Sequence, residues 1–424
     1  MQRMATRAPI RTSDLPAVAR LATDATAGLT DLVEAMHERI ARLPGLPRPA
    51  IDGRTSGLTG LVYKTIRGVT RVVGGSIEAL LGLLTPALGS DAAPAAEREA
   101  LVAALNGVLG DYLAATANPL ATPMTLRRDG RALPLERAAL AAVLPDISGS
   151  ALLLIHGLCM NDLQWTRDGH NQGLALASAL GLTPLFLHYN SGLHVSINGH
   201  ALAQRLEQLS LQWPVPLTRI AVVGHSMGGL LARSALHSAR QAGHRWPSLL
   251  TDLVFLGTPH HGAPLERAGH WIDIVLGATP YAAPFARLGK VRSAGITDLR
   301  HGNLLDEDWV GRDRYARGVD RRQPVPLPSD VRCFAVAASL ATQAGALRGE
   351  LLGDGLVPVD SALGRHRDPA RCLDFAAQRQ WIGYGMNHMD LLGHPEVHAR
   401  LMRALTEGTL AADDGRPSAA PPLA

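Results

Sequence analysis

The stretch that decides the fold is Ile220-Ala221-Val222-Val223-Gly224-His225-Ser226-Met227-Gly228-Gly229. It has the form of an apolar strand, then Gly-x-Ser-x-Gly, then a helix. In such a turn the serine hydroxyl projects above the sheet, and very small residues two positions before and after it let strand and helix approach closely. The alternative is a glycine-rich turn that merely packs. The strand before it and the helix after it favour a nucleophilic serine, Ser226.

Short apolar runs alternate with helix-length segments on both sides of this stretch. The runs are 151–155, 184–188, 220–223, 253–256 and 331–337, separated by helices such as 199–209 and 228–242. This alternation indicates βα units and a mostly parallel sheet with helices on both faces. We predict an α/β domain of this kind over residues 148–410.

Other parts of the chain have a different texture. Apolar residues at helical period predict a helical N-terminal region over residues 1–147, including a helix at 95–115 and a short hairpin around Arg128-Asp129-Gly130. Residues 263–327 interrupt the βα rhythm and predict a cap or lid. The residues 411–424, rich in Ala and Pro, predict a disordered tail.

Composition excludes several classes of protein. The chain has 424 residues, 46% of them hydrophobic and 18% charged, which excludes wholesale disorder. The net charge is only +4 and its arginines are scattered, so we expect no nucleic-acid partner. Three distant cysteines predict reduced thiols, and no metal-ligand spacing links them to histidines. We expect neither a metal nor another cofactor. Because neither a signal peptide nor a membrane-spanning segment is evident, we expect a cytoplasmic protein, either free or attached to a membrane surface.

A serine becomes a good nucleophile only when an imidazole takes its proton and a carboxylate orients that imidazole. We select His388, in Gly385-Met386-Asn387-His388-Met389-Asp390, because a base that comes last in the chain lies in a loop before a C-terminal helix. The alternatives are His225, His260 and His261. The orienting acid is predicted to be Asp354, between Gly353 and Gly355, in competition with Asp360, Asp374 and Asp390.

Acyl transfer also needs two backbone N–H groups directed at the developing oxyanion. One follows the nucleophile, here the N–H of Met227, and the other follows an earlier strand. The strand at 151–155 ends in His156-Gly157-Leu158, so Leu158 N–H is the second candidate donor. For His156 itself, a structural role in bonding this loop is favoured over a catalytic one.

Four ordered motifs carry a resemblance to a known family. They are Gly-His-Ser-Met-Gly-Gly at 224–229, Leu-Gly-Thr-Pro-His-His-Gly-Ala-Pro at 256–264, Asp-Gly-Leu-Val-Pro at 354–358 and Asn-His-Met-Asp at 387–390. Together they resemble bacterial α/β-hydrolase esterases and lipases, especially the branch similar to GPI inositol-deacylases, over about residues 150–405. The resemblance implies an α/β-hydrolase fold, a Ser226–His388–Asp354 triad and an oxyanion hole at Leu158 and Met227. Residues 1–147 lie outside it.

Two further segments suggest contacts with substrate or membrane. Residues 58–84 combine a wide apolar face with a mostly cationic stripe, which suits either docking on the hydrolase core or a second subunit, or peripheral membrane contact. Insertions at the carboxyl ends of strands line active sites, so the cap is expected to supply an acyl-chain pocket or to form its own small core. The candidate substrate-pocket residues are His156, His260, Trp271, Tyr281 and Phe285.

These features predict a serine hydrolase that cleaves carboxylic esters, including lipids, through an acyl-enzyme. An acyltransferase would use the same groups, with an alcohol replacing water. A non-catalytic binding protein on a hydrolase scaffold is the third hypothesis, although it predicts the loss of at least one triad position. The sequence leaves the natural substrate and the oligomeric state open.

Overall fold

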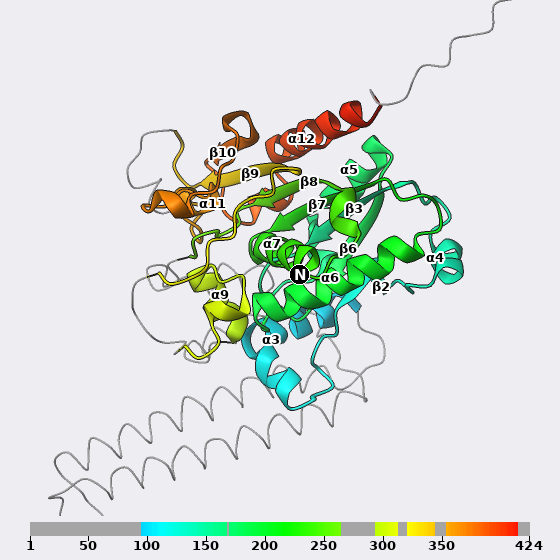
Figure 1. The fold of residues 1–424 in the computed structure, drawn as a ribbon, viewed down its shortest axis with the longest axis horizontal. Coiled ribbons are helices and arrows are strands. Elements are labelled where there is room, and N and C mark those ends of the chain that lie inside the picture. Colours follow the sequence, from blue (N-terminus) through cyan, green and yellow to red (C-terminus); the bar gives the residue numbers. More distant parts are fainter. Residues whose placement is uncertain (1–94, 168, 264–292, 313–319, 344–352, 414–424) are drawn as a thin grey trace, which may run out of the picture.

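An eight-stranded sheet forms the centre of the molecule (Figure 1). The computed structural model describes residues 95–167, 169–263, 293–312, 320–343 and 353–413. The strands are β1 Thr125–Arg128, β2 Arg131–Ala132, β3 Ser150–Ile155, β6 Thr183–His188, β7 Arg219–His225, β8 Leu250–Leu256, β9 Arg332–Ser339 and β10 Gln380–Tyr384. Their order across the sheet is β10-β9-β8-β7-β3-β6-β1-β2. A separate hairpin joins β4 Thr166–Arg167 to β5 His170–Asn171.

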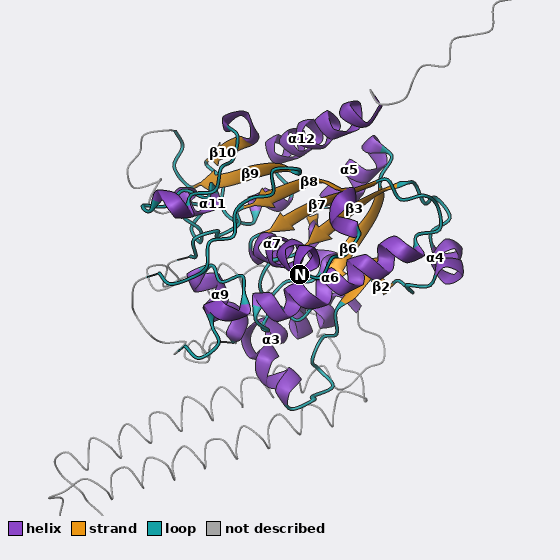
Figure 2. Cartoon of the chain, in the orientation of Figure 1, coloured by secondary structure: helices purple, strands orange, loops and turns teal. Residues whose placement is uncertain are grey.

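The six strands from β3 to β10 in this sheet run parallel, whereas β1 is antiparallel to β6. Helices surround the sheet (Figure 2). They are α3 Ala95–Ala115, α4 Arg137–Val143, α5 Gln172–Leu180, α6 Val195–Gln212, α7 Met227–Gln241, α9 Ala294–His301, α11 Val359–Ala362 and α12 Pro395–Asp413. This arrangement is the α/β-hydrolase fold that the motifs predict.

Alternate residues of each central strand enter two different apolar cores. In β3, Leu153 and Ile155 join the core that contains residues of α6 and α7, whereas Leu152 and Leu154 join the core that contains residues of α5 and α12. Successive side chains of a strand point to opposite faces, so both faces of the sheet are buried under helices. The strands are continuous apolar runs in the sequence because both of their faces are buried.

The five predicted strands and the helices predicted at 95–115, 199–209 and 228–242 are all present. Three strands depart from the expected arrangement. The hairpin β1–β2 adds to the main sheet beside β6, so the sheet begins before residue 148. The edge strand β10 was not among the predicted strands, because its five residues, Gln-Trp-Ile-Gly-Tyr, are not a continuous apolar run.

Several predictions fall on other residues. The segment 58–84, the pocket candidates Trp271, Tyr281 and Phe285, and much of the predicted cap lie outside the described residues. Helix α12 includes the first residues of the predicted tail, and the rest of the tail also lies outside.

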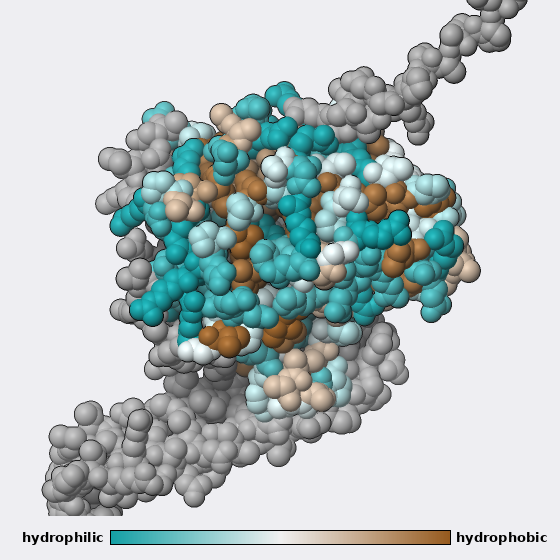
Figure 3. All heavy atoms as spheres, viewed as in Figure 1, coloured by the Kyte–Doolittle hydropathy of each residue, from teal (hydrophilic) through white to brown (hydrophobic). Residues whose placement is uncertain are grey.

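The surface in Figure 3 is mostly hydrophilic, with small, separated apolar patches on the face shown. In the described part of the chain, no helix is long and apolar enough to cross a membrane.

Candidate active site

Ser226 lies at the turn between β7 and α7, with φ 54° and ψ −123°. This is a left-handed conformation that residues other than glycine adopt only where surrounding contacts impose it. One such contact is the hydrogen bond from Ser226 N–H to the Leu256 carbonyl, 2.8 Å long. The strained turn predicted from Gly-x-Ser-x-Gly is therefore present, at the carboxyl end of the central strand.

The flanking glycines allow this turn because backbone atoms fill the space where side chains would lie. A Cβ on Gly224 would stand 2.6 Å from Gly229 N, and a Cβ on Gly228 would collide with the Ile155 carbonyl oxygen. The turn therefore requires glycine at both positions.

We expect Gly224→Ala to lower the free energy of unfolding by about 2 kcal/mol, because overpacking against a backbone typically costs 1–3 kcal/mol. Urea unfolding followed by circular dichroism measures the change. Gly393→Ala is the matched control, since its Cβ would meet nothing closer than Arg167 Cβ at 3.5 Å. An unchanged midpoint for Gly224→Ala would contradict the steric account of the turn.

The predicted base and acid are bonded to each other. His388 Nδ1 lies 2.6 Å from Asp354 Oδ2, and His388 N–H donates to the Asp354 carbonyl at 3.1 Å. The other carboxylate oxygen, Oδ1, accepts from the N–H groups of Leu356 and Val357. Both side chains are buried. Asp354 is thus fixed by two backbone donors and presents its remaining oxygen to the imidazole.

Glycines on both sides of Asp354 make this geometry accessible. Gly353 and Gly355 have φ of 58° and 93°, values that residues with a side chain rarely adopt.

The competing aspartates Asp360, Asp374 and Asp390 do not contact the His388 imidazole in the way Asp354 does. Asp390 accepts from Asn387 N–H at 2.8 Å, and Asp360 pairs with Arg365 in a solvent-exposed contact. Asp374 is exposed.

His388 and Ser226 come from separate loops at the same edge of the sheet. Ser226 is bonded to Leu256, and the next residue, Gly257, packs so closely on the imidazole that a Cβ there would lie 3.1 Å from His388 Cε1. The His388 Nε2 atom is buried and has no hydrogen-bond partner among the described residues. The hydrogen bond between a serine and its base is often long in a free enzyme and tightens with substrate. Nε2 is therefore the nitrogen available to a nucleophile.

The backbone N–H groups of Leu158 and Met227 take part in none of the turn and loop backbone hydrogen bonds between described residues. His156 Nδ1 bonds the Gly157 carbonyl at 2.8 Å. In a trans peptide the carbonyl and the following N–H point in opposite directions, so this bond fixes the direction of Leu158 N–H. The Tyr189 hydroxyl donates to the His156 carbonyl at 2.9 Å, and the two rings stack.

His156 therefore has contacts that suit the structural role predicted for it. It is fully buried, and burial lowers the pKa of its imidazole to about 3. A neutral ring that bonds the loop backbone can hold the loop without exchanging protons near neutral pH.

The contacts of His225 do not suit the role of catalytic base, for which it was an alternative. Its Nε2 lies 3.2 Å from the His388 carbonyl, and burial holds the pKa of the His225 imidazole well below its ordinary value. His260 and His261 follow β8, and His260 lines a cavity different from the triad, as described below. The geometry thus favours His388 among the predicted histidines.

A cysteine near the site does not compete as nucleophile. Cys159 lies in the loop after β3, next to Leu158, and burial raises the pKa of its thiol to about 12. The thiolate is the reactive form of cysteine, so Cys159 stays unreactive at neutral pH. Within the described ranges, no three histidine, cysteine or acidic residues are grouped to hold a metal ion.

By its sheet order and by the helices on both faces, the protein has the α/β-hydrolase fold. Residues 146–318 match the family described as PGAP1-like alpha/beta domain, which confirms the resemblance over this part of the chain. The match includes Ser226 and the loop after β3 that carries Leu158, and it ends before Asp354 and His388. No curated protein matches the sequence significantly.

Solved structures with similar folds are esterases and lipases of low sequence identity. The mature form of Bacillus licheniformis lipase BlEst2 is 16% identical, with a TM-score of 0.36, and the alignment covers 66% of this chain and 98% of that lipase. Aspergillus fumigatus lipase B is 11% identical, with a TM-score of 0.37 and coverage of 66% and 56%. A hyperthermophilic esterase from Pyrobaculum calidifontis is 15% identical, with a TM-score of 0.38 and coverage of 74% and 91%.

Proposed function

We propose that the protein is a serine hydrolase that cleaves carboxylic esters through an acyl-enzyme. The observation that carries the proposal is the buried His388–Asp354 pair at 2.6 Å, whose Nε2 has no partner among the described residues, at the same edge of the sheet as a serine in a strained turn. Asp354 holds the proton on Nδ1, which leaves Nε2 as an acceptor for the Ser226 hydroxyl proton.

In the first half-reaction Ser226 Oγ attacks the ester carbonyl carbon while His388 Nε2 takes the hydroxyl proton. The oxyanion accepts hydrogen bonds from Leu158 N–H and Met227 N–H, and loss of one such donor typically costs about 3–4 kcal/mol. The intermediate collapses, and the alcohol leaves with the proton from His388. Water then attacks the acyl-enzyme by the same route and releases the carboxylic acid.

We expect the full-length protein to hydrolyse nitrophenyl esters with a burst of nitrophenolate equal to the enzyme concentration, because formation of an acyl-enzyme precedes its hydrolysis. Stopped-flow absorbance at graded acyl lengths measures both the burst and the preferred chain length. Neither burst nor turnover at any length would contradict the proposal and favour a non-catalytic scaffold.

An acyltransferase would use the same groups, and the same assay separates the two activities. Adding an alcohol at constant water activity should leave a hydrolase releasing mostly free acid, whereas a transferase would convert most of the acyl group to the new ester.

We also propose that the substrates include lipids and that residues 58–84 contact a membrane surface. Vesicles of defined composition test both proposals.

A further inference from the structure

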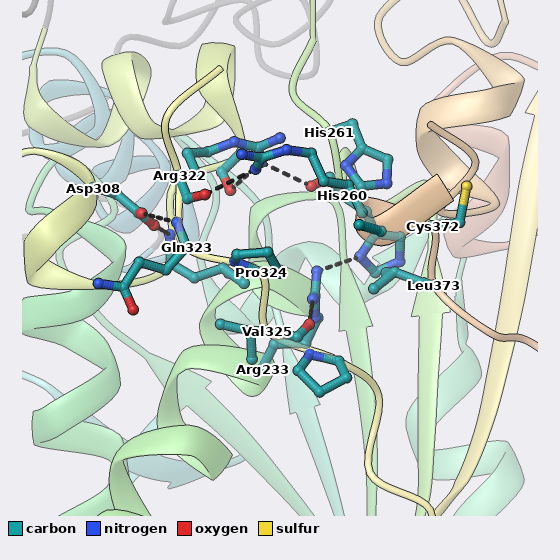
Figure 4. Close-up of a pocket in the computed structure, with 15 residues that line it drawn as sticks. Arg233, His260, His261, Asp308, Arg322, Gln323, Pro324, Val325, Cys372 and Leu373 are labelled. Atoms are coloured by element: carbon teal, nitrogen blue, oxygen red, sulfur yellow. Dashed lines mark hydrogen bonds between the residues drawn. The ribbon is translucent and has the colours of Figure 1, made fainter. Parts of the chain in front are cut away.

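A cavity separate from the candidate triad lies beside the loop that follows β8 (Figure 4). Its volume is about 70 Å³. Since one water takes up about 30 Å³ in the liquid, this space suits a small polyatomic ion. Its lining includes none of the candidate triad or oxyanion-hole residues. The charged and imidazole side chains that line it are Arg233, Arg322, Arg371, Asp308, His260 and His261.

Arg233 is a buried cation in this cavity without a carboxylate partner. It comes from α7 and is only 5% exposed. Its Nη1 donates to His260 Nδ1 at 3.2 Å and its Nη2 donates to the Val325 carbonyl, while Nε has no partner in the part of the chain that the structure describes. No carboxylate of the described residues lies within ion-pair distance of this guanidinium. A buried charge without an opposite charge costs several kcal/mol.

Several other buried or partly buried arginines of the chain are paired with carboxylates. The buried Arg219 pairs with Asp252 at 2.8 Å. On the cavity wall, Arg322 is bonded to both oxygens of Asp320. Arg233 differs from both, because no carboxylate of the described residues pairs with it and the like charge of Arg322 adds to burial in lowering its pKa.

His260 adds a second unsatisfied donor beside Arg233. Its Nδ1 accepts from Arg233, so the ring proton is on Nε2, an atom that is buried and has no partner among the described residues. Burial and then Arg233 hold the pKa of this imidazole well below its ordinary value, so the ring is neutral. Arg322 bonds the carbonyl of the same residue at 3.1 Å, which brings the two guanidinium groups together around His260 (Figure 4).

The one lining carboxylate does not neutralise Arg233. Asp308 Oδ2 accepts from the N–H groups of Leu304 and Leu305, and its Oδ1 accepts from Gln323 N–H. Arg322 and Arg371 both pair with Asp320, and Arg371 also pairs with Asp368, so Arg233 is the lining arginine without a carboxylate among the described residues. Burial and the charge of Arg322 lower the pKa of Arg233 to about 9, which an anion in the cavity would reverse.

We propose that this cavity binds a phosphate-class oxyanion, with Arg233 and the Nε2–H of His260 as its principal donors. A planar guanidinium presents several donors in a geometry that matches phosphate oxygens, and the buried setting strengthens each bond. Free phosphate and the phosphomonoester headgroup of a phospholipid share this chemistry. None of the lining residues belongs to the candidate triad or oxyanion hole, although His260 was also a candidate for the substrate pocket.

Isothermal titration of the full-length protein with inorganic phosphate, at constant ionic strength set by chloride, tests the proposal. We expect one phosphate per chain and a phosphate-dependent rise in melting temperature. Arg233→Gln should weaken binding at least about tenfold. Arg240→Gln is the matched control, because it removes the same charge from an exposed position of α7, where Arg240 pairs with Asp330.

A second variant keeps the test decisive if Arg233→Gln does not fold. Gln323 is exposed and lines the cavity, so Gln323→Glu adds a negative charge there without touching Arg233. It should weaken phosphate binding severalfold, whereas Gln241→Glu, at the exposed end of α7, should not.

Glycerol 3-phosphate and vesicles containing phosphatidic acid distinguish the two sources of the anion. Displacement of phosphate by either one supports the headgroup, and displacement by neither, with phosphate still bound, supports the free ion. The proposal is overturned if the wild type binds no phosphate above the chloride control, or if the cavity variants bind as tightly as their controls. Ester hydrolysis measured on the same samples reports separately on the triad.

Discussion

Replacing Ser226 with alanine should lower kcat for nitrophenyl ester hydrolysis by on the order of 10⁶-fold, the loss typical of removing a triad nucleophile. The hydroxyl is the atom that becomes acylated, and no other side chain at this turn can replace it. The positive φ of Ser226 should be tolerated by alanine because the backbone contacts that impose it remain, including the bond to the Leu256 carbonyl. The variant should therefore fold normally and still bind substrate.

A fluorophosphonate probe measures the same nucleophile without turnover. Wild-type protein should be labelled once, at Ser226, and Ser226→Ala should not be labelled. Intact-protein mass spectrometry and peptide mapping identify the site. Labelling that persists in the variant would refute Ser226 as the nucleophile.

Ser238 is a demanding control because it also contacts a histidine and an aspartate. Its Oγ lies 2.8 Å from His200 Nδ1, and His200 Nε2 lies 3.2 Å from Asp306 Oδ2. This surface group has neither a strained turn nor free backbone donors beside the serine, since Ser238 lies within α7. Ser238→Ala should therefore keep full activity and full labelling, which shows that proximity of the three residue types is insufficient.

The sequence predicted those parts of the fold and the site that local chemistry determines. Glycine at 224 and 228 is required by backbone contacts within a few residues of Ser226 or with the adjacent strand, so the pattern alone indicates the turn. Glycines around Asp354 act in the same local way, through positive φ. The alternation of buried residues in β3 likewise follows from a sheet covered on both faces.

Features made by distant contacts were not predictable in this way. Nothing in the residues around 125–132 shows that β1 will pair with β6, because that pairing joins segments far apart in the chain. Arg233 likewise reads as one charged residue in an amphipathic helix. Its burial depends on His260 and Val325, which are brought to it by the loop after β8 and by the segment before β9.

Replacing Asp354 with asparagine should lower kcat by about 10⁴-fold while leaving the fold intact, as expected when an imidazole is held in the wrong tautomer. The Oδ1 atom accepts from Leu356 and Val357 N–H, so an asparagine would place its carbonyl there and turn its amide toward His388 Nδ1. Nδ1 would then accept a hydrogen bond, and the ring proton would move to Nε2. A protonated Nε2 cannot take the proton of Ser226.

Asp390→Asn is the matched comparison, because Asp390 lies two residues from His388 and was the competing candidate. Its Oδ2 accepts from Asn387 N–H at 2.8 Å, a bond that an asparagine carbonyl can keep. We expect kcat within a few-fold of wild type and an unchanged rate of fluorophosphonate labelling, whereas Asp354→Asn should be labelled orders of magnitude more slowly. If Asp390→Asn shows the large loss and Asp354→Asn does not, the orienting acid has been wrongly assigned, and the short contact between Asp354 and His388 serves only to hold the loop.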